Sequence, residues 1–253
     1  METTRTVPSE SASGPSAGPG ASAPSSTFGT PPGPTDVPAP WNEVSWELVH
    51  GGRNDTKGSV WQGRLQGRRL ICKDLGSRAR RPVRGLRRRW ALRNEIRALQ
   101  LLEPVSGVPR LLDDWPGGMI MEWVPGTPLA GHDRKGVAAE VLDRFTAIVA
   151  AVHARDVVIG DLHWRNVLIG EQGEVHLVDF ELAQDRRHGL GRWVGGYMSR
   201  RDLFSVARLR RRYGAPLSEE QQALLDKPPF WRSGYRRLKR GLRNLGRRVG
   251  VGD

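Results

Sequence analysis

The chain has 253 residues and carries 40 Lys and Arg residues against 27 Asp and Glu residues, which gives a formal net charge of +13. The single cysteine, Cys72, excludes an internal disulfide, and no apolar run approaches the roughly 20 residues that a transmembrane helix needs. The basic charge favours anionic partners, although an arginine-rich composition of this kind also follows from a GC-rich coding sequence.

Residues 1–40 differ in composition from the rest of the chain. They are rich in Pro, Gly, Ser, Ala and Thr, and they hold too few large apolar residues to repay the entropy of ordering. We therefore expect a disordered tail, and the absence of a basic segment followed by an apolar run predicts that it is not a signal peptide. The tail holds Arg5 against Glu2, Glu10 and Asp36, a balance of −2, so the remainder carries +15.

Three short strands are predicted after this tail. They cover residues 46–50, 59–62 and 69–73, with a glycine-containing turn over 51–58 between the first two. Cys72 lies in the third strand, where we expect a buried structural thiol.

A helix is predicted from about residue 83 to residue 103. Its apolar face is expected to carry residues at roughly helical intervals, namely Leu86, Trp90, Ile96 and Leu99. Glu95 lies beside this face and has two interpretations. It pairs with Lys73 at the end of the third strand, or it is an exposed acid that balances the neighbouring arginines of its own helix, Arg88, Arg89 and Arg97.

An apolar strand over residues 119–124 then breaks into Pro125 and Gly126. This pattern is typical both of an edge strand that enters a turn and of a connector between two parts of a fold. A second long helix is predicted over 135–154. Its His153 is expected to pack or to form a hydrogen bond, because no second His or Cys lies at metal-binding spacing.

The most informative stretch runs from Ile159 to Glu181. Asp161, Asn166 and Asp179 lie on two loops that the hairpin of strands 167–169 and 175–178 holds side by side. Carboxylate and amide oxygens are the hard ligands that Mg²⁺ prefers, and a further carboxylate can accept the proton of a hydroxyl group. Magnesium-assisted phosphoryl transfer requires this set of groups.

An Asp, four residues, an Asn, a hairpin and then Asp-Phe resemble the catalytic and metal-binding loops of the protein-kinase-like superfamily. The resemblance spans about residues 44–212 and implies an α+β protein with a bilobal protein-kinase-like fold. Residues 41–121 would form a small antiparallel β-sheet N-lobe, residues 122–225 an abbreviated, mainly helical C-lobe, and residues 226–253 a basic amphipathic C-terminal extension.

The same resemblance implies ATP and Mg²⁺ as cofactors and assigns the site. Asp161 would be the catalytic base, Asn166 and Asp179 the metal ligands, and Lys73 with Glu95 the clamp on the phosphates. The remaining nucleotide contacts that it implies come from the glycine-containing turn, the gatekeeper position and the connector: Gly52, Gly58, Val60, Met121, Glu122 and Val124.

Departures from regulated protein kinases point in one direction. Gly160 replaces the Arg that reads a phosphorylated activation loop, Glu181 replaces the Gly after Asp-Phe, and no Ala-Pro-Glu element precedes Asp202. We therefore expect no regulation by loop phosphorylation. By the same resemblance, Asp202 is a candidate to brace the catalytic loop.

With these departures, the motifs look more like those of kinases that act on sugars, lipids and small molecules. The size fits best the lipopolysaccharide core kinases, which phosphorylate heptose or Kdo, and implies a lipid-linked sugar as acceptor. The alternatives are a RIO-type serine/threonine protein kinase, an aminoglycoside- or choline-like small-molecule kinase, and an inactive kinase-like binding module. The leading interpretation implies a cytoplasmic protein, peripheral at the inner membrane face, with nucleic acid a less favoured partner.

The C-terminal residues suggest two further helices. A short helix is predicted within residues 216–225, with Ser218 as a suitable capping residue at its start. Farther on, a stripe of apolar residues at helical spacing is surrounded by basic residues. The apolar residues are Tyr235, Leu238, Leu242 and Leu245. This amphipathic helix would either lie on an anionic membrane or dock its apolar stripe on the domain, and both interpretations stay open.

Overall fold

The computed structural model describes residues 33–50, 58–76, 82–133 and 136–227. The predicted site residue Gly52, the tail over residues 1–32 and the basic extension from residue 228 therefore lie outside the described residues. What is described is a mixed α+β arrangement of a small antiparallel sheet and several helices, which is compatible with a bilobal fold.

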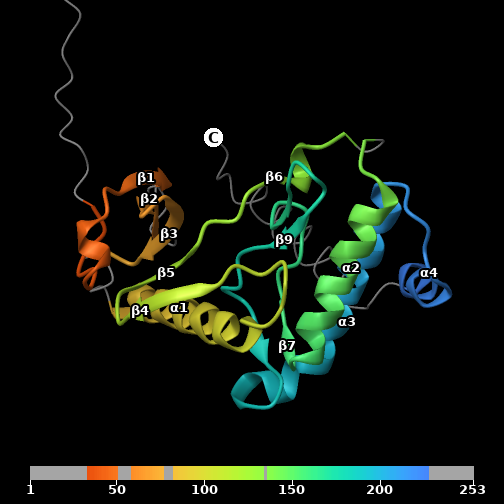
Figure 1. Ribbon diagram of the computed structural model, residues 1–253. Coiled ribbons are helices and arrows are strands. Elements are labelled where there is room, and N and C mark those ends of the chain that lie inside the picture. Colours follow the sequence, from red (N-terminus) through yellow and green to blue (C-terminus); the bar gives the residue numbers. More distant parts are fainter. Residues whose placement is uncertain (1–32, 51–57, 77–81, 134–135, 228–253) are drawn as a thin grey trace, which may run out of the picture. The chain divides into compact units, whose positions relative to one another are not determined.

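A five-stranded antiparallel sheet forms the N-terminal part, in the order β1-β2-β3-β5-β4 (Figure 1). Its strands are β1 (Glu47–His50), β2 (Ser59–Leu65), β3 (Arg68–Asp74), β4 (Leu111–Trp115) and β5 (Gly118–Glu122). The turn between β2 and β3 places Gln66 and Gly67 at φ 49° and 79°, as a two-residue hairpin with matching twist requires. This register sets Val60 directly opposite Lys73.

The side chains of β3 alternate between the two faces of the sheet. Leu70 and Cys72 pack with Val44, Trp61 and Ile120 in one cluster. Cys72 is fully buried there, and burial raises the pKa of its thiol, which agrees with a structural role. Lys73, on the other face, is consequently directed away from this cluster.

Residues 33–40, which the composition assigns to the tail, contact the sheet. The backbone N–H and the hydroxyl of Thr35 both donate to the Asp74 carboxylate at 3.1 Å, and Val37 packs against the cluster of Val44 and Trp61. The 3₁₀ turn η1 (Trp41–Glu43) follows, and the Trp41 indole N–H donates to Asp113 at 2.7 Å. A buried carboxylate at Asp74 thus gives this polar segment a partner that its composition does not reveal.

Helix α1 (Pro82–Leu102) buries a different face from the one predicted. Leu92, Glu95, Leu99 and Leu102 are buried at intervals of three and four residues, whereas Leu86 is 71% exposed and Trp90 is 42% exposed. The prediction for Leu86 and Trp90 is wrong because the buried face passes through a charged residue, Glu95, which apolar periodicity leaves out.

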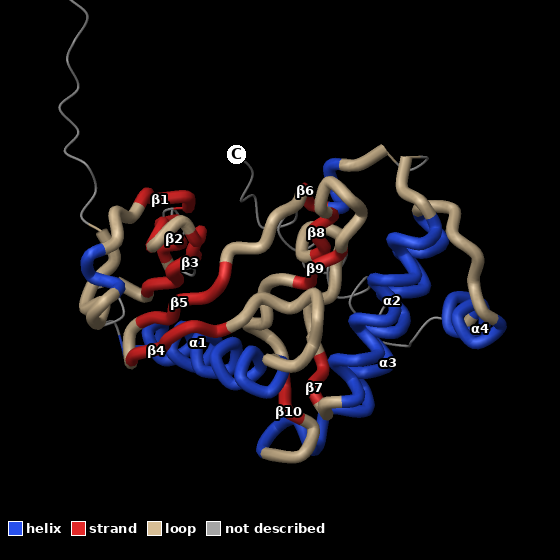
Figure 2. Tube along the Cα trace, in the orientation of Figure 1, coloured by secondary structure: helices blue, strands red, loops and turns tan. Residues whose placement is uncertain are grey.

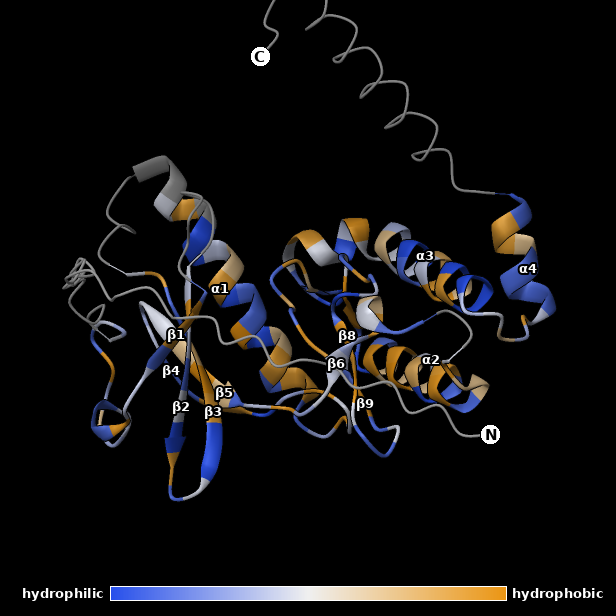
Figure 3. Cartoon of the chain, turned by 90° about the horizontal axis from the view of Figure 1, so that it is seen from above, coloured by the Kyte–Doolittle hydropathy of each residue, from blue (hydrophilic) through white to orange (hydrophobic). Residues whose placement is uncertain are grey.

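The remainder of the described chain is mainly helical. It contains α2 (Ala139–Ala154), α3 (Gly189–Arg212) and α4 (Glu219–Asp226), together with η3 (Leu129–Gly131). Helix α2 starts four residues later than predicted and buries Leu142, Phe145, Val149 and Val152. Figure 3 shows that much of this helix is hydrophobic. Helix α4 begins at a capping box, in which the Gln221 N–H donates to the Ser218 hydroxyl and the Ser218 N–H donates to the Gln221 side chain.

Short strands connect the helical part to the loops of the predicted site (Figure 2). Strands β6 (Thr127–Pro128), β8 (Val167–Ile169) and β9 (Val175–Leu177) form one small sheet, and β7 (Val157–Val158) pairs with β10 (Gln184–Asp185). The pairing of β8 with β9 is the hairpin that the sequence predicts. Among the described residues, no helix combines the length and the apolar character that a membrane span requires.

Candidate functional site

A cavity of about 390 Å³ lies between the face of the sheet that carries Lys73, helix α1 and the loops around β8 and β9. Most of the residues that the sequence assigns to a site line this cavity: Gly58, Val60, Lys73, Glu95, Met121, Glu122, Val124, Asn166 and Asp179. Asp161 is not among the lining residues. Predicted site residues as far apart in the sequence as Gly58 and Asp179 are therefore brought to one cavity.

Lys73 and Glu95 form a bidentate ion pair at this cavity. The Lys73 Nζ donates to Glu95 Oε1 at 2.6 Å and to Oε2 at 2.8 Å, and Glu95 is only 1% exposed. The Asp179 Oδ1 lies 3.9 Å from the same Nζ. The interpretation of Glu95 as an exposed acid that balances its neighbouring arginines is wrong, because its side chain faces β3 rather than solvent.

Three carboxylates surround the ammonium group of Lys73. Burial lowers the pKa of Lys73, but the charges of Glu95, Asp179 and Glu181 outweigh burial, so the pKa lies above its ordinary value and the group is cationic at neutral pH. Burial raises the pKa of Glu95, and the neighbouring Asp179 and Glu181 carboxylates raise it further, against the opposing effect of Lys73. The site therefore concentrates negative charge around the ammonium group of Lys73.

Asp179 has a backbone conformation that is uncommon for a residue with a side chain. Its φ is 70°, in the left-handed region, and the next residue, Phe180, is buried and donates its N–H to Glu95 Oε1 at 3.3 Å. Such strain persists where the surroundings fix it, and it is frequent at functional sites. The bond from Phe180 ties the loop of Asp179 to helix α1.

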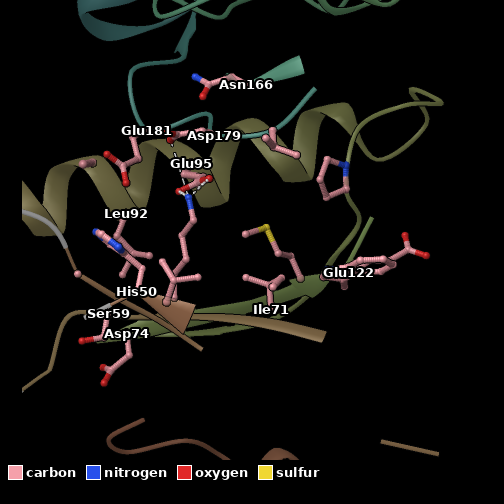
Figure 4. A pocket seen from close by; sticks show the side chains of 18 of the residues that line it. His50, Ser59, Ile71, Asp74, Leu92, Glu95, Glu122, Asn166, Asp179 and Glu181 are labelled. Carbon is pink, nitrogen blue, oxygen red and sulfur yellow. Dashed lines mark hydrogen bonds and ion pairs between the residues drawn. The ribbon is translucent and has the colours of Figure 1, made fainter. Parts of the chain in front are cut away.

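Glu181 adds a carboxylate that the sequence analysis left without a role. One oxygen each of Glu95, Asp179 and Glu181 lies within 4.8 Å of the others, and Figure 4 shows the three side chains gathered on one side of the cavity, with Asn166 beyond Asp179. The donor set of Asn166, Asp179 and Glu181 consists of hard oxygens and fits Mg²⁺ chemically. The position of Glu181, two residues after Asp179, is the feature of the sequence that could have identified this third oxygen donor.

Hydrogen bonds to Asp202 hold the loop that carries Asp161. The fully buried Asp202 carboxylate accepts the N–H groups of Ile159 at 2.8 Å and Gly160 at 3.0 Å, and His153 Nε2 lies 3.1 Å away. This is the bracing that the sequence analysis expects of Asp202, and His153 takes part in hydrogen bonding as expected.

Gly160 has a steric reason to be glycine. Its φ is 78°, and a Cβ atom built on it would lie 2.8 Å from the carbonyl oxygen of Leu182. The position before Asp161 therefore brings the backbone against the loop that follows Asp179. The sequence alone identifies Gly160 as a replacement for Arg and does not reveal this contact with Leu182.

Asp161 itself is half exposed, unlike Glu95 and Asn166, which line the cavity and are buried. Its side chain is 47% exposed, and His163 Nε2 lies 3.8 Å from its Oδ2. The backbone carbonyl of Asp161 accepts a hydrogen bond from the side-chain amide of Asn166 at 3.2 Å, and Asn166 is 8% exposed. Asp161 is thus attached to the cavity through Asn166 while its carboxylate stays open to solvent.

At the opposite end of the cavity, β5 leads into the predicted connector. Met121 is buried, while the N–H of Glu122 donates to the carbonyl of Arg110 at 2.9 Å and the N–H of Trp123 donates to the carbonyl of Arg69 at 3.2 Å. The N–H groups of Glu122 and Trp123 are therefore occupied within the protein. A ligand at this end would have to use other backbone groups of this segment.

Comparison with known proteins gives partial relationships. No protein-family model matches the sequence. Over 139 residues, 46% of this chain, it is 30% identical to a protein named probable SapB synthase from Streptomyces coelicolor. Over 117 residues, 41% of this chain, it is 29% identical to a putative ribosomal protein S6 kinase alpha-2 from Caenorhabditis elegans. The chain spans about 15% of the length of each relative, so the similarity indicates a kinase-like relationship and nothing finer.

Proposed function

We propose that the protein is an ATP- and Mg²⁺-dependent phosphotransferase that acts on a hydroxyl group. The observation that carries this proposal is the bidentate pair of Lys73 and Glu95, with Asp179 3.9 Å from the same ammonium group, at the cavity that Asn166 also lines. The kinase-like similarity over 117 residues supports the same chemistry.

Each polar group has a distinct task in this proposal. Lys73 binds phosphate oxygens, and Glu95 fixes the orientation of its ammonium group. Asn166 and Asp179 hold Mg²⁺, with Glu181 as a further oxygen donor, and the bound ion supplies neutralisation of phosphate charge. Asp161 accepts the proton of the acceptor hydroxyl as the hydroxyl oxygen bonds to the γ-phosphorus, the bond from that phosphorus to the bridging β-phosphate oxygen breaks, and ADP leaves.

The described elements divide between two substrates in this proposal. The sheet and α1, within residues 41–121, take the nucleotide between Val60 and Met121 on the adenine side, with Gly58 near the phosphates and Glu122 and Val124 at the adenine edge. Residues 122–225 hold the acceptor at Asp161. The tail and the basic extension from residue 226 remain outside this scheme.

The acceptor is proposed on electrostatic grounds. The balance of +15 outside the tail suits an anionic acceptor at a membrane face, and a lipid-linked sugar such as a lipopolysaccharide core sugar meets that requirement. Under this proposal the protein is cytoplasmic and peripheral at the inner membrane face. A protein acceptor is the second candidate, favoured by the similarity to a putative S6 kinase.

A phosphotransfer assay with both acceptors tests the proposal. Purified protein is incubated with radiolabelled ATP, Mg²⁺ and either core glycolipid or a basic protein substrate, with Asp179→Asn as the matched inactive variant. We expect Mg²⁺-dependent transfer by the wild type, at least 100-fold reduced in the variant, as loss of a metal ligand predicts. Absence of Mg²⁺-dependent nucleotide binding by the wild type would contradict the enzyme reading, and preferential labelling of the protein substrate would overturn the glycolipid assignment.

A further inference from the structure

Arg88 is a second cation at the same cavity, and it lacks the compensation that Lys73 has. It lies on α1 seven residues before Glu95, so Arg88, Leu92 and Glu95 follow one another on one face of the helix and all line the cavity. Its side chain is nearly buried, since the residue is 8% exposed, and its Nε is buried without a hydrogen-bond partner.

Two acidic side chains of the cavity, Asp74 and Glu95, are engaged by other groups. Asp74, which also lines the cavity, accepts hydrogen bonds from Thr35 and from the Gly76 N–H, and Glu95 is occupied by Lys73. Among the residues that the structure describes, no ion pair forms with Arg88. By contrast Arg97, on the same helix, pairs with Asp185 at 3.0 Å.

Burial of a guanidinium group whose Nε has no hydrogen-bond partner is unfavourable, and arginine cannot lower this cost by losing its proton. Arginine stays protonated at every pH a protein tolerates, whereas burial of an uncompensated charge costs free energy. A site of this kind recovers that cost when an anion enters it. Because planar guanidinium groups donate paired hydrogen bonds, phosphate oxygens are well suited to Arg88.

The position of Arg88 within the cavity indicates which phosphates it meets. Leu92, one helical turn from Arg88, and His50 both line the cavity, and Figure 4 shows them at the end opposite Glu122. Glu122 belongs to the segment proposed to meet the adenine edge. Arg88 therefore lies toward the end of the cavity that is remote from the base.

We propose that Arg88 binds the outer phosphate groups of the nucleotide, beside Lys73, and gives the site its preference for nucleoside di- and triphosphates over monophosphates. This inference rests on the proposed function and extends it. Lys73 is compensated by Glu95, so Arg88 is the cation whose charge is available to the outer phosphates.

The test replaces Arg88 by methionine, which keeps the length of the side chain and removes its charge. Arg89→Met is the matched control, because Arg89 is the next residue of α1 and is exposed. Binding of ATP, ADP and AMP in the presence of Mg²⁺ is measured by calorimetry for the full-length chain. We expect Arg88→Met to weaken ATP and ADP binding roughly 10- to 100-fold, as loss of charge-assisted hydrogen bonds predicts, with AMP changed less than about twofold.

A second measurement separates ligand binding from a structural role. The melting temperature of Arg88→Met without nucleotide should equal or exceed that of the wild type, because an unpaired buried charge is removed, while the increase that ATP produces should shrink. A melting temperature lowered in the absence of nucleotide, with equal losses for all three nucleotides, would assign Arg88 to folding alone and overturn the inference. Unchanged ATP affinity in the variant would do the same.

The outcome also distinguishes this inference from the proposed function. If the wild type binds ATP but Arg88→Met binds it equally well, only the role of Arg88 falls. If the wild type binds none of the three nucleotides, the proposed function fails and the role of Arg88 with it. Arg88→Lys should restore part of the ATP affinity, because a single ammonium group keeps the charge without the paired hydrogen bonds.

Discussion

The two sides of the candidate site differ in how firmly the protein holds them. On the nucleotide side, the Lys73 side chain is 18% exposed and that of Glu95 is 1% exposed, and their hydrogen bonds join β3 to α1. On the acceptor side, the side chains of Asp161 and His163 are 47% and 44% exposed and lie 3.8 Å apart. One side is a buried ion pair and the other is an open surface.

This difference has consequences for both energetics and specificity. The buried pair is fixed before any ligand arrives, which favours one defined ligand geometry. The open carboxylate of Asp161 is compatible with an acceptor much larger than the cavity, such as a membrane-bound glycolipid or a protein. Substitution of Glu95 in the buried pair should therefore affect folding and activity together, whereas substitution of the exposed Asp161 should affect activity alone.

Asp161→Asn is expected to have the largest effect on activity. Loss of a general base typically lowers kcat by about 10²- to 10⁴-fold, and the half-exposed side chain should leave the free energy of unfolding within roughly 0.5 kcal/mol of the wild type. Steady-state kinetics and urea unfolding measure the two quantities. A variant with full activity, or one that loses stability in proportion to activity, would remove the distinction between the two sides.

Glu95→Gln should instead damage both properties. Removing one partner of a buried ion pair costs about 3–5 kcal/mol, because Lys73 loses the carboxylate to which it donates both hydrogen bonds, and the hydrogen bond from Phe180 is weakened as well. Chemical unfolding and nucleotide binding should both report the loss. Glu103→Gln is the control, since its pair with Arg110 is exposed and 3.6 Å long; equal stability of the two variants would contradict the importance of the buried pair.

Asp202→Asn tests whether the loop that carries Asp161 depends on its hydrogen bonds to Asp202. The carboxylate accepts two backbone N–H groups of the loop before Asp161, and an amide can present only one acceptor oxygen, so we expect a loss of about 1–3 kcal/mol. Faster hydrogen exchange at Ile159 and Gly160 should accompany it. Asp133→Asn, at an exposed position, serves as the control. Unaltered exchange at both amides would show that the loop holds its shape without Asp202.

The sequence predicts the local parts of this site better than the long-range ones. The hairpin of β8 and β9 and the spacing of Asp161, Asn166 and Asp179 are set within about twenty residues, where alternation and turn residues carry the information. The pairing of Lys73 with Glu95 was left between two interpretations, because it depends on how α1 packs on the sheet.

Buried charge is where sequence reasoning was least successful. Apolar periodicity selected Leu86 and Trp90 for the inner face of α1, whereas the structure buries Arg88 and Glu95. Residues 33–40 show the same limit, because the carboxylate of Asp74 that holds Thr35 lies 39 positions away. Polar residues that are buried for a ligand or a partner cannot be recognised from a pattern of apolar residues alone.

The smallest effect is expected at Asp185, where the helix that carries Glu95 is tied to the loop that follows Asp179. Asp185 accepts hydrogen bonds from Arg187 and from Arg97 of α1. Burial raises its pKa, but these bonds outweigh burial and lower the pKa to about 2 from an ordinary value of 3.8. A carboxyl group whose pKa is lower in the folded state stabilises the fold above about pH 4, and that contribution disappears as the pH falls through about 2.

Comparing Asp185→Asn with the wild type across pH measures this contribution. The wild type should be the more stable protein above pH 5 by a constant margin, and the margin should narrow between about pH 4 and pH 2, where Asp185 is protonated. Asp133→Asn removes the same charge from an exposed site and controls for net charge. A margin that stays constant down to pH 2 would show that the arginine contacts of Asp185 do not stabilise the fold. Because the hydrogen bond from Arg97 to Asp185 joins α1 to the loop that follows Asp179, its loss should weaken nucleotide binding slightly. The loop of Asp161 is held by Asp202 instead and should be unaffected.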